Sequence, residues 1–235
     1  MIDALLITAC IKPTINNFIS IKDEQARLNS YLDALDFWIT QSEFKYLVFC
    51  ENSNFEYDYT PLKKKALKHG KELEVILFIG NEKVMDFGKG FAEGEIIEHA
   101  LSKSELLRQT DSFYKVTGRI KIANINKILS IHSDDENYFN LAAPGAKSVD
   151  TRFFKVNIDF YKEKLLKKYE EVRDEEGIYL EVVFYNHLSR LSPSSFKRYP
   201  IAKGISASTG TTYEKSSFGI FLRNILSILG RYRVS

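Results

Sequence analysis

The sequence predicts an α/β fold with a central, mostly parallel sheet flanked by helices. Four short apolar runs have the character of buried strands, and a segment with helical spacing separates each run from the next. Strands that alternate with helices in this way pair in parallel through right-handed crossovers. The chain of 235 residues is long enough for one such sheet with a sizeable core. The four runs are residues 4–10 (ALLITAC), 46–50 (YLVFC), 73–79 (LEVILFI) and 112–116 (SFYKV).

Three helices are predicted between these strands. The first covers residues 23–40, because apolar residues such as Leu28, Leu35 and Trp38 recur at helical spacing. The second covers residues 61–69 and has a proline at a first-turn position. The third covers residues 93–108.

The second half of the chain is predicted to be less regular. Polar residues mark a loop at 134–137, and residues 192–212 form a long region rich in Ser, Gly, Thr and Pro. No low-complexity linker divides the chain, so one compact domain is expected. The other predicted elements are helices over 120–130, 158–173, 179–191 and 218–233, and short strands over 139–143 and 150–156.

Composition limits the classes of function. Hydrophobic residues make up 44% and charged residues 27% of the chain, which is typical of a folded soluble protein. The net charge of +2 is too balanced to indicate nucleic-acid binding. The two cysteines form no disulfide framework or zinc motif, no signal peptide is recognisable, and no apolar run could span a bilayer. We therefore expect a cytoplasmic location.

Residues 88–119 carry the clearest indication of chemistry. A Gly-Lys-Gly loop leads into a helix, and the helix leads into a strand that ends in Thr117, Gly118 and Arg119. Glycines and cations at the carboxyl edge of an α/β sheet suit a phosphorylated ligand. Lys89, Lys115 and Arg119 are the candidate phosphate ligands. Lys115 is the most informative of them, because a lysine inside a buried strand is costly without a partner.

Four places resemble small bacterial glycosyltransferases of the GT-A type, which build capsules and lipopolysaccharide. The first strand ends in Thr8-Ala9-Cys10, where such enzymes begin the nucleotide pocket, and the second ends in Glu51-Asn52-Ser53, where they place a residue near base or ribose. Residues 88–94 and 113–119 are similar to the loop, helix and central strand of these enzymes. The resemblance covers residues 4–119 well and the rest loosely.

The resemblance implies a Rossmann-like GT-A sandwich and an assignment for each part of the chain. Residues 1–119 would bind the nucleotide sugar, residues 120–216 would hold the acceptor and catalytic groups, and residues 217–233 would form an amphipathic helix. The nucleotide sugar would be a co-substrate, and the acceptor would be a glycan or a lipid-linked sugar. The implied donor-binding residues are Thr8, Ala9, Glu51, Lys89, Lys115, Thr117, Gly118, Arg119 and Arg152.

One departure from the family bears on mechanism. GT-A enzymes usually end the central strand in an Asp-x-Asp pair that holds a divalent metal, whereas this strand ends in Lys-Val-Thr-Gly-Arg. Cations cannot replace carboxylates as metal ligands, but they can neutralise a departing diphosphate directly. We therefore assign no metal site and expect no metal requirement. Asp134-Asp135 is the alternative metal site.

Asp150 and Glu181 are the candidate catalytic bases. Asp150 and Arg152 stand two residues apart on one strand face, where they can contact the donor or simply pair with each other. Glu181 lies in an otherwise apolar run, so its carboxylate either has a buried partner or lines a cleft. Asp150 is slightly favoured for donor contact and Glu181 as the base.

Two C-terminal features have alternative interpretations. The loop over residues 203–210 can close over the donor or be an ordinary surface connection. The apolar helix over 218–233, with three arginines, can lie on the inner face of an anionic membrane or pack in a core or homodimer. The rival to a glycosyltransferase is a nucleotide- or glycan-binding module that has the fold but no catalysis.

Overall fold

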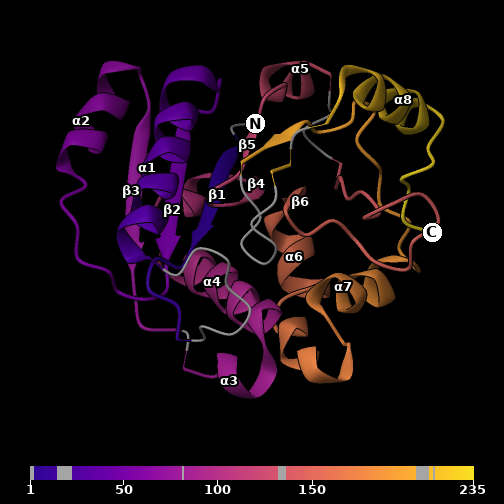
Figure 1. Cartoon of the computed structure of the whole chain (residues 1–235), viewed down its shortest axis with the longest axis horizontal. Helices are drawn as coiled ribbons and strands as arrows, with labels where there is room; N and C mark the ends of the chain where they lie inside the picture. Colours follow the sequence, from indigo (N-terminus) through magenta and orange to yellow (C-terminus); the bar gives the residue numbers. More distant parts are fainter. Residues whose placement is uncertain (1–2, 15–22, 81, 132–135, 205–211, 214) are drawn as a thin grey trace.

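The structure is a computed structural model that describes residues 3–14, 23–80, 82–131, 136–204, 212–213 and 215–235. A five-stranded sheet forms the centre of the molecule (Figure 1). Its strands are β1 (Ala4–Ala9), β2 (Tyr46–Glu51), β3 (Glu72–Leu77), β4 (Ser112–Thr117) and β6 (Phe153–Asn157). Their order is β3-β2-β1-β4-β6. The first four pair in parallel and β6 pairs antiparallel with β4, so the predicted mostly parallel α/β fold is confirmed.

Helices cover both faces of the sheet. Because successive side chains of a strand point to opposite faces, Leu5 and Ile7 pack into one core and Ala4 and Leu6 into the other. The first core lies under α1, α2 and α5, and the second lies under α4, α6 and α7. The helices are α1 (Glu24–Gln41), α2 (Thr60–Lys68), α3 (Val84–Phe87), α4 (Lys89–Lys103), α5 (Ile125–Leu129), α6 (Ile158–Lys164), α7 (Leu180–Leu188) and α8 (Ser217–Ile228).

The start of α4 differs from the prediction. Residues 88–90 were predicted as a loop, but the helix already begins at Lys89. Gly88 has a φ of +102° and turns the chain from α3 into α4. The Asp174 carboxylate then accepts a hydrogen bond from the Lys89 backbone N–H at 2.8 Å, which caps the helix. Lys89 therefore belongs to the first turn of a helix and not to a glycine-rich loop.

Several elements of the second half are shorter than predicted. The helix expected over residues 158–173 ends at Lys164, and Lys167 has a φ of +65°, which breaks the helical path. The segment 120–130 begins with a short strand before α5, and 139–143 forms only isolated bridges. The last helix ends at Ile228. The short strands β5 (Lys121–Ile122) and β7 (Ala202–Lys203) pair with each other.

The strand order reverses between β1 and β4. The chain first builds outward from β1 to β2 and β3, and α4 then returns it to the other side of β1. The crevice beyond the carboxyl ends of strands at such a reversal is the usual ligand site of open α/β sheets. Among the residues that the structure describes, no helix is long and apolar enough to cross a membrane.

Candidate functional site

A cavity of about 630 Å³ lies at the reversal point of the sheet. Thr8 and Ala9 line it from the end of β1, and Thr117 and Arg119 line it from the end of β4 and the turn that follows. Residues of α3, α4 and α7 form further parts of the wall. The volume falls within the range of small-molecule sites, which is roughly 300–1,000 Å³.

The cavity brings together most of the predicted site residues. Seven of the eleven line it, although they are spread over more than 170 positions of the chain. The seven are Thr8, Ala9, Lys89, Thr117, Arg119, Arg152 and Glu181. The other four, Glu51, Lys115, Gly118 and Asp150, lie outside its lining.

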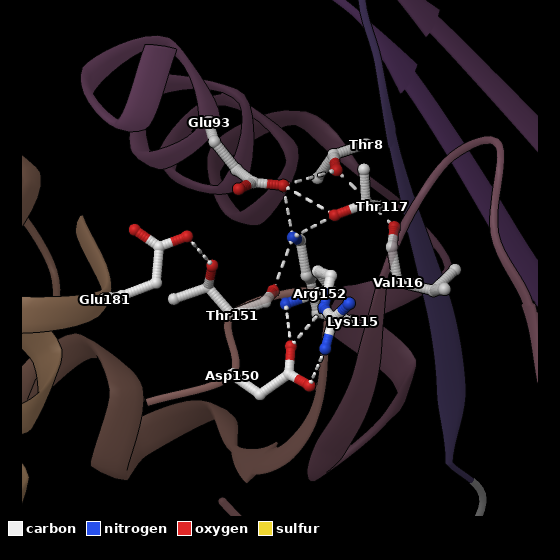
Figure 2. Close-up of polar contacts among 9 residues, drawn as sticks. All are labelled: Thr8, Glu93, Lys115, Val116, Thr117, Asp150, Thr151, Arg152 and Glu181. Carbon is white, nitrogen blue, oxygen red and sulfur yellow. Dashed lines mark hydrogen bonds and ion pairs between the residues drawn. The ribbon is translucent and has the colours of Figure 1, made fainter. Parts of the chain in front are cut away.

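A charged network forms the floor of the cavity (Figure 2). One carboxylate oxygen of Glu93 accepts hydrogen bonds from the hydroxyls of Thr8 at 3.2 Å and Thr117 at 3.1 Å, and it pairs with the Lys115 ammonium. Lys115 also donates to the Thr151 carbonyl oxygen at 2.8 Å. The Lys115 side chain is fully buried, so its charge depends on this pairing. Its position supports a role in orienting Glu93, in place of the phosphate contact predicted for it.

Glu181 stands in the first turn of α7 and faces the cavity. Its carboxylate accepts a hydrogen bond from the Thr151 hydroxyl at 3.0 Å (Figure 2). Burial raises the pKa of the Glu181 carboxyl, and the negative charge of Glu93 acts in the same direction. A carboxyl group with a raised pKa at a cavity wall is suited to proton transfer.

Three cations line the cavity near one another: Arg27 from α1, Lys89 from α4 and Arg119 after β4. Burial lowers the pKa of Lys89; Asp174 opposes this effect, whereas Arg27 and Arg119 add to it. Burial also lowers the pKa of Arg119, and Arg27 acts in the same direction. The three positive charges therefore repel one another, and a bound anion would relieve that repulsion.

The two arginines have donors that nothing satisfies within the described part of the chain. Arg27 is 4% exposed and Arg119 is 5% exposed, and the Nη1 atom of each has no hydrogen-bond partner there. Arg27 is held in place because its Nε donates to the Ile11 carbonyl oxygen at 2.9 Å. An unmet buried donor costs about 1–3 kcal/mol, and more when it is charged. Both residues also line the cavity, so an anion bound there would lie close to their guanidinium groups.

Glu51 holds the loops beside the cavity in place through hydrogen bonds to their backbone. It is fully buried and accepts backbone N–H groups of Ile11 at 2.8 Å and of Ser53 and Phe55 at 3.0 Å. These bonds hold the loops after β1 and β2, and Glu51 does not line the cavity. The next residue, Asn52, does line the cavity, and both polar atoms of its amide lack partners among the described residues.

Gly118 makes a close approach to the sheet. A Cβ atom at this position would lie 2.5 Å from the Thr8 carbonyl oxygen and 2.8 Å from the Tyr31 ring. Its backbone N–H donates to that same Thr8 oxygen at 2.8 Å. Gly118 therefore lets the turn after β4 pack closely against β1, and its place among the donor-binding residues stays a prediction.

Asp150 and Arg152 form a bidentate pair. The Arg152 guanidinium donates to the two Asp150 carboxylate oxygens at 2.7 Å and 2.6 Å (Figure 2). The pairing that the sequence left open is therefore present. Asp150 lines a second cavity of about 160 Å³, and Arg152 and Tyr213 line both cavities. This position favours Glu181 over Asp150 as the group that faces a ligand in the main cavity.

Within the described ranges, no three His, Cys, Asp or Glu side chains are grouped as metal ligands. Asp134 and Asp135, the alternative metal site, lie outside the described residues, as do residues 205–210 of the loop predicted over 203–210. Among the described residues, five carboxylate side chains line the cavity together with its cations and hydroxyls: Asp86, Glu93, Asp174, Glu175 and Glu181. The expected absence of a metal requirement therefore stays a prediction.

Sequence reasoning missed two functional candidates, Arg27 and Glu93, and it named a third, Asn52, only within the Glu51-Asn52-Ser53 motif and not as a donor-binding residue. Each left a signal. Arg27 lies one helical turn before Tyr31, on the buried side of α1, where a charged side chain is rarely found without a partner or a ligand. Lys115 in a buried strand required a carboxylate partner, and Glu93 in the preceding helix was available. Asn52 directly follows a buried strand end, where ligands bind in this fold class.

No protein-family model matches the chain, and no curated protein matches it in sequence. Among solved structures, the chain is similar to a cytidylyltransferase from Leptospira borgpetersenii serovar Hardjo-bovis (strain JB197), with 15% identity and a TM-score of 0.38. The match covers 69% of this chain and 63% of that one, so it spans less than two thirds of that structure. A nucleoside-diphosphate-sugar pyrophosphorylase from Vibrio cholerae RC9 matches with 13% identity and a TM-score of 0.42, over 80% of this chain and 88% of that one.

Proposed function

We propose that this protein is a glycosyltransferase that uses a nucleotide-sugar donor. The observation that carries the proposal is the pair of buried, unsatisfied guanidinium donors of Arg27 and Arg119 beside Lys89, in a cavity at the reversal point of the sheet. Such a site suits a phosphorylated ligand. The carboxyl group of Glu181 on the same cavity adds a group for proton transfer.

The cations would stabilise the leaving group. When the bond between the anomeric carbon and the phosphate oxygen breaks, the electron pair remains on that oxygen of the departing nucleoside mono- or diphosphate. Arg27, Lys89 and Arg119 would neutralise this charge, which is the role a divalent metal has in enzymes with an Asp-x-Asp pair. Asn52, with a free amide donor and acceptor among the described residues, would contact the base or the ribose.

Glu181 would act on the acceptor. In a displacement with inversion, the acceptor hydroxyl oxygen forms the new bond to the anomeric carbon and its proton passes to a carboxylate. Glu181 is our candidate for that base. Glu93 is less suited, because one of its oxygens is already shared by Thr8, Lys115 and Thr117.

The acceptor we propose is a growing bacterial surface glycan, as in capsule or lipopolysaccharide synthesis. Two features support a sugar acceptor: the resemblance carried by residues 88–119, and the second cavity that shares Arg152 and Tyr213 with the first. That second cavity carries tyrosines and a charged pair, a lining that suits a polyhydroxylated ligand.

The test is an assay of donor hydrolysis and transfer across a panel of UDP-, GDP- and CMP-sugars, with and without EDTA. We expect turnover of at least one donor that EDTA leaves unchanged. If no nucleotide sugar or nucleotide binds, the proposed function is wrong. Strong inhibition by EDTA would keep the function and refute the metal-free leaving-group stabilisation.

The rival function, a binding module without catalysis, makes a different prediction. Glu181→Gln should leave nucleotide affinity nearly unchanged in either case. In a transferase it should also reduce turnover, whereas a module has no turnover to lose. Glu176→Gln serves as the comparison, because Glu176 is exposed and lies outside the lining of both cavities.

A further inference from the structure

The last helix presents its apolar side to the outside of the protein. α8 lies at the periphery of the molecule (Figure 1). Phe218 and Ile228 are each 74% exposed, and Phe221 is 61% exposed. Side chains at this spacing share one face of a helix. The α8 apolar face consists of Phe218, Phe221, Leu222, Ile225, Ile228 and Leu229.

The polar side of the same helix faces inward. Ser227 is buried, and the Asn224 side-chain oxygen accepts the Tyr199 backbone N–H at 3.1 Å. The Arg223 guanidinium lies 5.7 Å from the centre of the Tyr199 ring. Helices on globular proteins normally bury the apolar side and expose the polar one. The contacts of Asn224 and Arg223 with Tyr199 accompany the opposite orientation in this helix. An exposed apolar patch of this kind marks an interaction surface.

The charge of the surrounding segment favours an anionic partner. Residues 195–235 contain seven Lys or Arg and one acidic residue, a net charge of +6 in a chain whose total is +2. Exposed Lys215 precedes the helix and exposed Arg231 follows it. An apolar helix face flanked by cations is the pattern that binds anionic lipid.

We propose that the α8 apolar face docks on an anionic lipid bilayer, with the helix in the membrane plane and its apolar side chains at the acyl boundary. A second copy of the chain would instead bring two segments of charge +6 together, which electrostatic repulsion disfavours. The docking requires no particular reaction at the cavity. The docking proposal can therefore be tested independently of the proposed function.

The second cavity connects this face with the main site. Ile220 and Arg223 of α8 line it, together with the Arg152 and Tyr213 that it shares with the main cavity. If the proposed function is also correct, docking would bring a lipid-linked acceptor close to the second cavity, where we propose that the acceptor binds. This consequence, unlike the docking itself, rests on the proposed function.

Vesicle sedimentation tests the docking. Full-length protein is mixed with vesicles of phosphatidylcholine alone or of phosphatidylcholine with phosphatidylglycerol. We expect binding to the anionic vesicles and at least about tenfold weaker binding after Phe218→Ser/Ile228→Ser, since large apolar side chains leave the interface. Leu67→Ser is the matched control, because Leu67 is 66% exposed on α2, outside the proposed surface. Thermal unfolding should be unchanged in both variants.

A fluorescence reporter gives an independent measurement. Trp38 is the single tryptophan of the chain and is fully buried, so Phe221→Trp adds an exposed reporter to a constant background. Its emission should shift to the blue with anionic vesicles, and added salt should reduce the effect. Equal binding to neutral vesicles, or no binding to anionic ones, would overturn the proposal. So would a lipid-free dimer that requires Phe218 and Ile228 and does not bind vesicles.

Discussion

At the scale of single residues, a buried lysine organises the floor of the cavity. Lys115 pairs with Glu93, and Glu93 in turn fixes the hydroxyls of Thr8 and Thr117. The sequence indicated that a lysine in this buried strand needs a partner for its charge, but it did not indicate which residue is that partner. The partner comes from α4, and only the packing of α4 against β1 and β2 brings the two side chains together.

A double-mutant cycle tests this pair. Lys115→Met should lower the free energy of unfolding by about 3–5 kcal/mol, because Glu93 loses the cation that compensates its burial. Adding Glu93→Gln should recover part of the loss. Chemical denaturation of the four proteins of the cycle measures the coupling energy. Strictly additive losses would contradict the pairing.

The raised pKa of Glu181 makes a prediction about pH. The folded carboxyl holds its proton to a higher pH than the unfolded one, so stability falls as pH rises above about 4.3, the ordinary pKa of glutamate. Glu181→Gln removes this loss. As pH rises above about 4.3, the free energy of unfolding of the variant should increase relative to that of the native protein. Below that pH, the difference between the two free energies should not change with pH. Denaturation at several pH values checks this, and Glu176→Gln, at an exposed position, is the control.

The same substitution should reduce catalysis if Glu181 is the base. General-base groups contribute about 10²–10⁴-fold, so turnover of Glu181→Gln should fall by about 100-fold or more, with little change in donor affinity. Steady-state kinetics on the donor found in the panel assay measures both quantities. A variant with nearly full turnover would remove Glu181 from the reaction.

Arg27 and Asn52 should differ in the ligands that they affect. Arg27→Gln should weaken binding of both pyrophosphate and a nucleoside diphosphate by about 10- to 100-fold, because a charge-assisted hydrogen bond is lost. Asn52→Ala should weaken only the nucleotide. Calorimetric titration of both ligands into both variants separates the two roles. Equal effects of Asn52→Ala on the two ligands would contradict its assignment to base or ribose.

At the scale of elements, the first half of the chain was the more predictable. Strands β1 to β4 and helices α1 and α2 agree with the expected ranges to within a few residues, because buried strands and amphipathic helices leave a regular pattern. The helix predicted over 158–173 ends at Lys164 in the structure, for a physical reason. Leu165 and Tyr169 are buried at helical spacing, but Lys167 between them adopts a positive φ, and nothing in the pattern reveals it.

The junction before α4 gives a prediction about stability. Ala at position 88 would place its Cβ 2.1 Å from the Asp174 carboxyl carbon and would adopt a φ of +102°. Gly88→Ala should therefore cost more than the about 1–3 kcal/mol of backbone strain alone, because it also displaces the helix cap. Gly145→Ala is the matched control, with a φ of +77° and no atom within 4 Å of its Cβ. Equal losses in urea denaturation would show that the cap contributes nothing.

At the scale of the whole molecule, the strand order creates the site. Because β4 returns to the free side of β1, residues from positions 8 to 181 meet at one edge of the sheet. The fold class and this edge could be predicted from the alternation of strands and helices. The contributions of Arg27 and Glu93 could not, since they depend on how two helices rotate about their axes when they pack.

The most direct test of the account is a calorimetric titration of the full-length protein in EDTA with nucleoside diphosphates and with the matching nucleosides. We expect a diphosphate to bind at least about tenfold more tightly than its nucleoside, because the cation group of Arg27, Lys89 and Arg119 provides most of the recognition. Equal affinity for diphosphate and nucleoside, or no binding of either, would contradict it.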